Sequence, residues 1–227
     1  MSAPHRPPRA VLWDVDVTMI DSSEYHWLSW RETLAAEGFA LTRGQFTAVF
    51  GRRNDEILRG YFGEDYPPAE VARVGDAKER LYRELVRERG ISLLPGVGRW
   101  LARLKAGAWL QAMASSAPRA NLEAIAEALD LRGYFDAVVS AEDVTRGKPD
   151  PEVFLVAARK AGVPPRRAVV FEDAPFGIQA AKAAGMHAVG VTTTQPAAVL
   201  RAAGADEVVD RLAAYDVPGL LRRLSGS

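Results

Sequence analysis

Short apolar segments alternate along the chain with longer segments in which apolar residues recur at helical spacing. The short runs have the composition of strands buried on both faces of a parallel sheet, and the longer segments suit helices that pack against such a sheet. The expected strands are residues 10–13, 108–114, 136–140, 168–171 and 187–191. The pattern therefore predicts an α/β fold with a Rossmann-like parallel sheet at its core.

The interval between the first two expected strands is far longer than a crossover between parallel strands needs. It contains four segments with helical patterns, separated by glycine-containing turns or a proline: residues 23–37, 42–49, 54–62 and 68–89. Pro95 and Gly96 mark the return to the sheet, because they stop the last helix and start the next element. We therefore expect a small α-helical cap domain over residues 21–94, inserted into a core formed by residues 1–20 and 95–227.

Acidic residues directly follow two of the expected strands. Asp14 and Asp16 come after residues 10–13, and Glu172 and Asp173 come after residues 168–171. The carboxyl ends of parallel strands meet at one edge of the sheet, where open α/β sheets bind ligands. Two like charges 4 Å apart repel by about 4 kcal/mol at an effective dielectric of 20. The sequence therefore predicts a cation at this edge.

The composition excludes several other classes of function. Lysine plus arginine equals aspartate plus glutamate at 29 each, so no excess of positive charge favours nucleic acid or an anionic membrane surface. The absence of cysteine excludes disulfides, thiol catalysis and cysteine-ligated zinc. The first nine residues lack the apolar segment of a signal peptide, and no long apolar run follows. We expect a cytoplasmic protein, a monomer or small homo-oligomer, whose partner is a small molecule.

Four short motifs occur in a specific order. They are Asp14-x-Asp16-x-Thr18 after the first strand, Ser115 at the end of the second, Lys148-Pro149, and Glu172-Asp173. As a set they resemble the four motifs of the haloacid dehalogenase-like superfamily, although any one of them alone would be weak. The helical insertion after the first motif is similar to the subgroup that contains β-phosphoglucomutase and small phosphosugar or phosphoglycolate phosphatases. The resemblance spans nearly the whole chain.

The resemblance implies a role for each acidic residue. Asp14 would be the nucleophile that attacks phosphorus to form an aspartyl-phosphate. Asp16 would protonate the leaving oxygen and then accept a proton from water. Asp14, the backbone carbonyl of Asp16 and Asp173 would hold Mg²⁺, a hard ion that prefers oxygen ligands, while Glu172 would orient a metal-bound water.

The resemblance also implies a set of phosphate-binding residues. Lys148 would offset the charge of the nucleophile and the phosphoryl group. Ser115 and the backbone amide of Ser116 would hold phosphoryl oxygens in the transition state. Thr18 is expected among these residues, tying the first loop together by hydrogen bonding.

The expected cap contributes candidates for substrate recognition. His26 looks like the cap histidine that couples substrate binding to the acid/base aspartate in β-phosphoglucomutase, and Lys78 matches a cap residue that reaches the site from above. Related sugar phosphatases carry both, and either residue could instead be solvated. Arg52 and Arg53 precede Asn54, the position nearest the mutase arginine for a non-reacting phosphate. Either arginine could bind a distal phosphate or carboxylate, or remain a solvated loop charge.

These inferences favour a Mg²⁺-dependent phosphatase that hydrolyses a small phosphomonoester, with a sugar phosphate as the expected substrate. The enzymatic alternative is a β-phosphoglucomutase, which would return the phosphoryl group to sugar. A non-catalytic phospholigand-binding module stays open because Val17 stands where this subgroup usually has glycine, and valine would be strained at a positive φ. Dehalogenation is disfavoured because it needs neither Asp16 as a proton donor nor Mg²⁺.

Overall fold

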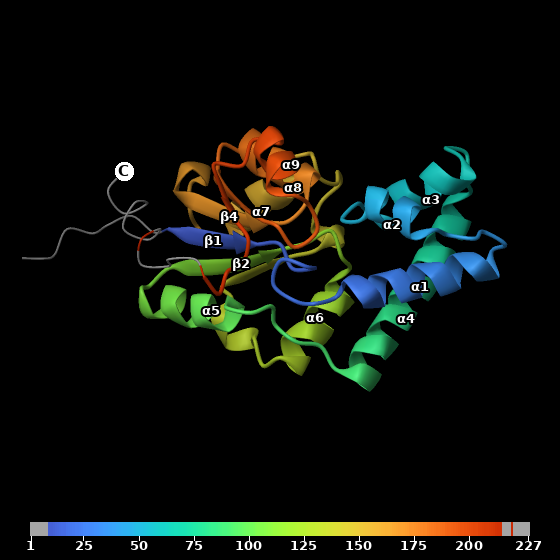
Figure 1. Ribbon diagram of the computed structural model, residues 1–227, viewed down its shortest axis with the longest axis horizontal. Coiled ribbons are helices and arrows are strands. Elements are labelled where there is room, and N and C mark those ends of the chain that lie inside the picture. The colour runs from blue at the N-terminus through green and yellow to red at the C-terminus, as the bar shows by residue number, and fades with distance from the viewer. Residues whose placement is uncertain (1–8, 215–218, 220–227) are drawn as a thin grey trace, which may run out of the picture.

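The computed structural model describes residues 9–214 and residue 219 of the chain. The outer ends of the expected core, residues 1–8 and 220–227, lie outside the described residues, as do residues 215–218. Figure 1 shows a sheet enclosed by helices at one end of the molecule and a group of four helices at the other. Within the described part, no helix combines the length and the apolar character needed to cross a membrane.

Six parallel strands form the sheet in the order β3-β2-β1-β4-β5-β6. Their bounds are Ala10–Trp13 for β1, Leu110–Ala114 for β2, Ala137–Val139 for β3, Ala168–Glu172 for β4, His187–Val191 for β5 and Glu207–Val209 for β6. The first five confirm the strands expected from the apolar runs. The sixth was missed because it has only three residues and lies half-buried at the edge, where no long apolar run is needed.

Helices cover both faces of the sheet (Figure 1). The helices α5 (Val97–Ala106) and α6 (Arg119–Ala128) lie on one face. The other face carries α7 (Glu152–Lys160), α8 (Pro175–Ala183) and α9 (Ala197–Ala202). Short 3₁₀ segments at Arg132–Tyr134, Ala141–Asp143 and Pro165–Arg167 complete the connections. The result is the three-layer arrangement typical of parallel sheets.

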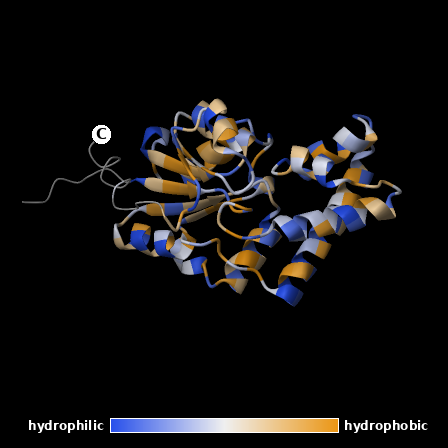
Figure 2. Cartoon of the chain, viewed as in Figure 1, coloured by the Kyte–Doolittle hydropathy of each residue, from blue (hydrophilic) through white to orange (hydrophobic). Residues whose placement is uncertain are grey.

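The alternation of side chains along β1 divides the core into two apolar clusters. Val11 and Trp13 point to the face covered by α5 and α6, whereas Leu12 packs on the opposite face. Trp13 stacks on Phe171 of β4 with 4.7 Å between the ring centroids. In Figure 2 the strands are mostly in the hydrophobic colour, while the helices carry hydrophobic and hydrophilic residues side by side. The strands are thus buried on both faces, as the uninterrupted apolar runs predict.

The inserted segment folds into four helices with their own apolar cluster. They are α1 (Ser23–Ala36), α2 (Arg43–Val49), α3 (Asn54–Phe62) and α4 (Pro68–Arg89). Trp30 of α1, Leu58 of α3 and Val74 of α4 are buried in this cluster. The four helices lie beyond the carboxyl ends of β1, β2 and β4 (Figure 1), so they form a cap over the edge where the acidic residues are expected.

Candidate active site

The loop after β1 carries the first pair of acidic residues. The backbone amide of Asp14 donates to the carbonyl of Phe171 on β4, 3.0 Å away. Val17 has a φ of 58°, the left-handed conformation that strains a β-branched residue by roughly 1–2 kcal/mol. The loop keeps this conformation because the amide of Val17 donates to the carbonyl of Ile20 at 3.0 Å and the Val17 side chain is buried.

Lys148 joins the acidic residues from two strands. Its Nζ donates to Asp14 Oδ1 and to Glu172 Oε1, each at 2.6 Å. All three side chains are buried, and the second oxygen of Glu172 accepts from the backbone amide of Ala174 at 2.7 Å. Burial acts to lower the pKa of Lys148, but the charges of Asp14 and Glu172 outweigh it and raise the pKa. Lys148 is therefore held as an ammonium ion beside the expected nucleophile.

Three buried carboxylates gather where β1 and β4 end. One oxygen from each of Asp14, Glu172 and Asp173 lies within 4.8 Å of the others. The Asp173 carboxylate is held by hydroxyl groups, from Thr18 to Oδ1 at 2.8 Å and from Thr194 to Oδ2 at 2.6 Å. Burial, and then the charge of Glu172, raises the pKa of Asp173 to about 7, and burial also raises the pKa of Asp14.

This donor set fits a hard divalent cation. Buried carboxylate oxygens are the ligands that such ions prefer, and one lysine does not neutralise three acids. A cation in contact with Asp14 and Asp173 would lower both pKa values again. Asp14 would then be ionised, as a nucleophile must be. The three carboxylates therefore could hold a metal ion.

Asp16 lies in a different environment from Asp14. Its Oδ1 accepts hydrogen bonds from Ser22 Oγ at 2.8 Å, His26 Nε2 at 2.8 Å and the Tyr82 hydroxyl at 3.4 Å. Burial acts to raise the pKa of Asp16, but His26, Ser22 and Lys78 outweigh it and lower the pKa to about 2. Asp16 is therefore an ionised carboxylate whose position is set by residues of the cap and of the segment that leads into it.

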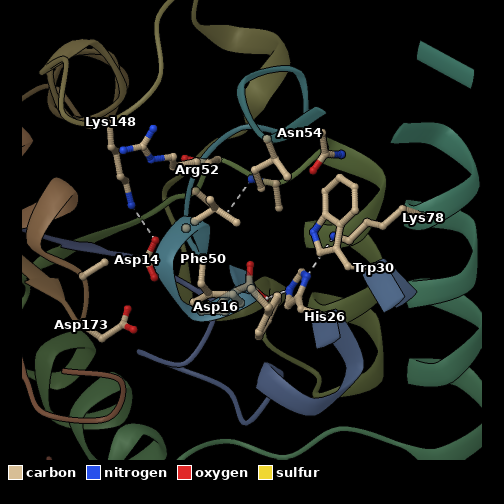
Figure 3. Close-up of a pocket in the computed structure, with 18 of the residues that line it drawn as sticks. Asp14, Asp16, His26, Trp30, Phe50, Arg52, Asn54, Lys78, Lys148 and Asp173 are labelled. Atoms are coloured by element: carbon tan, nitrogen blue, oxygen red, sulfur yellow. Dashed lines mark hydrogen bonds and ion pairs between the residues drawn. The ribbon is translucent and has the colours of Figure 1, made fainter. Parts of the chain in front are cut away.

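The cap reaches Asp16 through His26 and Lys78 (Figure 3). Lys78 Nζ lies 2.9 Å from His26 Nδ1, and His26 Nε2 lies 2.8 Å from Asp16 Oδ1. An ammonium group can only donate, so Nδ1 accepts and Nε2 carries the proton that is shared with Asp16. His26 and Lys78 are 7% and 2% exposed. The alternative that these two residues are solvated on the cap surface is therefore wrong.

Ser115 and Ser116 stand at the carboxyl end of β2. The amide of Ser115 donates to the carbonyl of Val139 on β3 at 3.1 Å, and its hydroxyl accepts from the amide of Ala117 at 3.0 Å. Both serines line the same pocket as Asp14 and Lys148. This places a hydroxyl group and a tight backbone turn beside the expected nucleophile.

One family accounts for these motifs. A family model described as haloacid dehalogenase-like hydrolase matches residues 11–191, a range that includes all four motifs and the cap. The chain belongs to the haloacid dehalogenase-like hydrolases. This confirms the resemblance inferred from the four motifs, and the cap after β1 has the position expected for the subgroup with a helical insertion.

Relatives of this haloacid dehalogenase-like chain include both enzyme types considered from the sequence. It is 35% identical to β-phosphoglucomutase of Bacillus subtilis, with 83% of this chain and 85% of the relative covered. It is 34% identical to fructose-1-phosphate phosphatase YqaB of Escherichia coli, with 80% and 95% covered. The structure of CbbY from Rhodobacter sphaeroides in complex with phosphate superposes with a TM-score of 0.80 at 30% identity, covering 91% and 96% of the two chains.

Most of the expected residues line one pocket between the cap and the sheet. The lining contains Asp14, Asp16, His26, Arg52, Lys78, Ser115, Ser116, Lys148, Glu172 and Asp173. The guanidinium group of Arg52 lies over the ring of Phe176, 4.4 Å from its centroid. The haloacid dehalogenase-like motifs therefore converge, together with three of the four cap residues considered for substrate contact.

Thr18 and Arg53 were both included among the phosphate- or substrate-binding candidates, and both lie outside the pocket lining. Thr18 is fully buried and its hydroxyl donates to Asp173, so it supports the acidic cluster from behind. Arg53 does not line the pocket; its Nη1 donates to the carbonyls of Ala141 and Val144 in the core at 3.1 and 3.3 Å. Its Nε donates to Asp55 Oδ1 at 3.1 Å, so the guanidinium group of Arg53 is bonded to protein groups outside the pocket lining.

Sequence reasoning missed two polar residues that hold the site together. Thr194, after β5, bonds to Asp173, and its position after an expected strand was a usable signal. Glu79 is 4% exposed, lines the pocket and accepts from Lys78 Nζ at 2.8 Å and from Asn54 Nδ2 at 2.8 Å. A glutamate next to a lysine on a helix gives no such signal, because its partners come from other elements.

Proposed function

We propose that this chain is a Mg²⁺-dependent phosphatase that hydrolyses a monophosphorylated sugar or sugar alcohol through an aspartyl-phosphate. The observation that carries the choice of hydrolysis is the position of Arg53. A mutase must bind a bisphosphate in two orientations, and this requires cations at the end of the pocket away from Asp14. Arg53 does not supply such a cation, because it lies outside the pocket lining and donates to core carbonyls, and the neighbouring Asn54 bonds to the carboxylate of Glu79.

In the first half of the reaction, a carboxylate oxygen of Asp14 forms a bond to phosphorus while the bond from phosphorus to the sugar oxygen breaks. Asp16 gives its proton to the departing oxygen, so it must enter this step protonated, in the form that proton transfer from water leaves at the end of each turnover. Departure of the sugar returns it to the carboxylate form that the unliganded site favours. Lys148, 2.6 Å from Asp14, offsets negative charge on the nucleophile and the phosphoryl group. Ser115 and the Ser116 amide would hold phosphoryl oxygens, a role supported by their place in the pocket lining.

In the second half, water attacks the phosphorus of the aspartyl-phosphate and the bond to Asp14 breaks. Asp16 accepts the proton of the attacking water, for which the carboxylate form is required. The hydrogen bonds from His26 and Ser22 favour that form. Inorganic phosphate leaves and Asp14 is regenerated.

Asp14, Asp173 and the backbone carbonyl of Asp16 are the proposed Mg²⁺ ligands, with Glu172 in reach of the same ion. When bound, the ion would neutralise charge that builds up on the phosphoryl oxygens. The grouping of three buried carboxylate oxygens within 4.8 Å supports this assignment.

The names of the relatives support the substrate class. Besides the fructose-1-phosphate phosphatase, they include a phosphorylated carbohydrates phosphatase of Thermotoga maritima and hexitol phosphatase B of Escherichia coli. The pocket of this chain combines the indole of Trp30 with the polar groups of Asn54 and Glu79. Such a lining suits a polyhydroxylated carbon chain.

The test is phosphate release by the purified protein from a panel of hexose, hexitol and pentose monophosphates, phosphoglycolate and an aryl phosphate. Release that depends on Mg²⁺ and is lost in Asp14→Asn supports the proposal and ranks the substrates. Release that persists in Asp14→Asn contradicts the nucleophile assignment. No release from any compound contradicts the phosphatase proposal.

The second candidate function is β-phosphoglucomutase, favoured by the relative from Bacillus subtilis and by Arg52 in the pocket lining. It predicts glucose 6-phosphate from β-glucose 1-phosphate in the presence of a bisphosphate primer, with little free phosphate. Failure of both assays, with retained binding of inorganic phosphate, would indicate a phospholigand-binding module.

A further inference from the structure

Two cap residues hold the same core residue from opposite sides. Glu79 and Arg83 lie one turn apart on α4, and both bond to the side chain of Asn121 on α6. Asn121 Nδ2 donates to Glu79 Oε2 at 2.6 Å, and Asn121 Oδ1 accepts from Arg83 Nη1 at 2.8 Å. Asn121 is fully buried. Its amide can make both bonds in only one orientation, so the contact is specific for a cap seated on α6.

The carboxylate of Glu79 also begins a path of hydrogen bonds that leads to Asp16. Glu79 Oε1 accepts from Lys78 Nζ at 2.8 Å, Lys78 Nζ lies 2.9 Å from His26 Nδ1, and His26 Nε2 lies 2.8 Å from Asp16 Oδ1. An unbroken path of hydrogen bonds therefore runs from a core helix, through the cap, to the acid/base residue of the core. Figure 3 shows its last steps, with Lys78 and His26 leading to Asp16.

Glu79 is the one member of this path that bonds to both the core helix and Lys78. Burial acts to raise its pKa, but Lys78, His26 and its hydrogen bonds lower it, so Glu79 is ionised. Lys78 is 2% exposed, and a buried ammonium group without an opposite charge is costly. The rings of Trp30 and Tyr82 lie 5.3 and 5.5 Å from Lys78 Nζ and complete its surroundings.

We propose that Glu79 is a positioning residue through which seating of the cap on Asn121 places His26 against Asp16. The proposal rests on the proposed phosphatase function, in which Asp16 handles the proton of the leaving group. Because Asn121 belongs to the core and Glu79 to the cap, their bond forms only when the two are docked. Docking completes the partners of Glu79, which holds Lys78, which in turn orients His26. Proton transfer by Asp16 is thereby tied to a closed pocket.

The test compares two substrates that differ in their need for a proton. A sugar phosphate has a poor leaving group that must be protonated, whereas p-nitrophenyl phosphate releases a stable anion. For both, kcat/KM reports the steps up to departure of the alcohol. In Glu79→Gln we expect kcat/KM on the sugar phosphate to fall about a hundredfold, which is the lower end of the rate gain that a positioned general acid supplies. On the aryl phosphate we expect kcat/KM to fall less than about threefold. Asn121→Ala should show the same selectivity.

An exchange variant tests the link to α6. In Glu79→Gln combined with Asn121→Asp, the glutamine amide can donate to the new aspartate while its oxygen accepts from Lys78, and Arg83 can still donate to residue 121. We expect kcat/KM of this double variant on the sugar phosphate to be at least tenfold higher than that of Glu79→Gln alone. Glu84→Gln, an exposed position on the same helix, is the matched control.

Three results would overturn the proposal: equal losses on both substrates, no loss in Glu79→Gln, or a selective loss that the exchange does not recover. Thermal unfolding of each variant shows whether it has folded. If Glu79→Gln has not folded, the two substrates are compared in Asn121→Ala instead. Wild-type protein that releases phosphate from neither substrate would instead contradict the phosphatase function, so the two failures are distinguishable.

Discussion

Lys148 Nζ lies 2.6 Å from Asp14 Oδ1, deep beneath the cap. The two residues are 134 positions apart in the sequence, with the whole cap between them, and meet because the loop before α7 lies at the carboxyl end of β1. This pair brings a permanent positive charge to the atom that we assign as the nucleophile. It also ties Asp14 to Glu172, which accepts from the same ammonium group at 2.6 Å.

Replacement of this ammonium group tests its role. Lys148→Met keeps the approximate length of the side chain but leaves Asp14 and Glu172 without a counter-charge. We expect kcat to fall by about 10²–10³, as for loss of a group that stabilises transition-state charge. Unpairing buried charges should also lower the free energy of unfolding by about 3–5 kcal/mol without metal. Steady-state kinetics measure the fall in kcat, and urea unfolding in EDTA measures the fall in the free energy of unfolding. Activity within tenfold of wild type would contradict the assignment.

The acidic cluster predicts how stability depends on pH and metal. Asp173 has a pKa raised from 3.8 to about 7, and the pKa of Asp14 is raised in the same direction. The folded chain thus binds more protons at these groups than the unfolded chain. Their contribution to the free energy of unfolding falls as the pH rises from about 4 to about 7.

Mg²⁺ competes with these protons, so we expect it to raise the melting temperature more at pH 8 than at pH 5. Thermal unfolding in EDTA and in Mg²⁺ at both pH values measures the effect, with Asp173→Asn as the variant in which it should largely disappear. If Mg²⁺ raised the melting temperature equally at the two pH values, the assignment of the acidic cluster as the metal site would be contradicted.

Gly177 predicts a steric effect on the same cluster. A Cβ added at this position on α8 would lie 1.7 Å from Glu172 Oε1. Gly177→Ala must therefore displace the carboxylate that bonds to Lys148, and we expect loss of most activity together with weaker Mg²⁺ binding. Gly60→Ala on α3 is the matched control, since its Cβ would meet nothing within 4 Å and should stabilise the helix by roughly 0.5–1 kcal/mol. Calorimetric titration measures the Mg²⁺ affinity of the two variants, and steady-state kinetics measure their kcat. Similar affinities and similar kcat values for Gly177→Ala and Gly60→Ala would contradict this account.

Val17 predicts a variant that retains activity. Val17→Gly removes strain of roughly 1–2 kcal/mol at a φ of 58°, but loses a buried side chain and makes the unfolded chain more flexible. These effects oppose one another, so we expect a small net change in the free energy of unfolding. Because Asp14 and Asp16 keep their hydrogen-bond partners, kcat should stay within about threefold. A much larger gain in activity would mean that valine distorts the site.

Much of the fold followed from local pattern. The apolar runs predicted five of the six strands because a strand buried on both faces needs several consecutive apolar residues, a requirement that the short edge strand β6 escapes. The helices of the cap were expected to within two residues at each end, since helical spacing and glycine turns are local properties. Placement of acids after strands predicted that Asp14, Asp16, Glu172 and Asp173 would meet, because parallel strands end at one edge.

The docking of the cap was decided by tertiary structure alone. Arg52 and Arg53 are adjacent in sequence, yet Arg52 lines the pocket and Arg53 bonds to the core. Glu79 and Asn121 are 42 residues apart and carry no shared motif. The sequence by itself determined the α/β fold, the family and the residues at the strand ends, because these depend on local composition and order. Which cap side chains face substrate, and which hold the cap to the core, depended on how two packed units meet, and no local pattern encodes that contact.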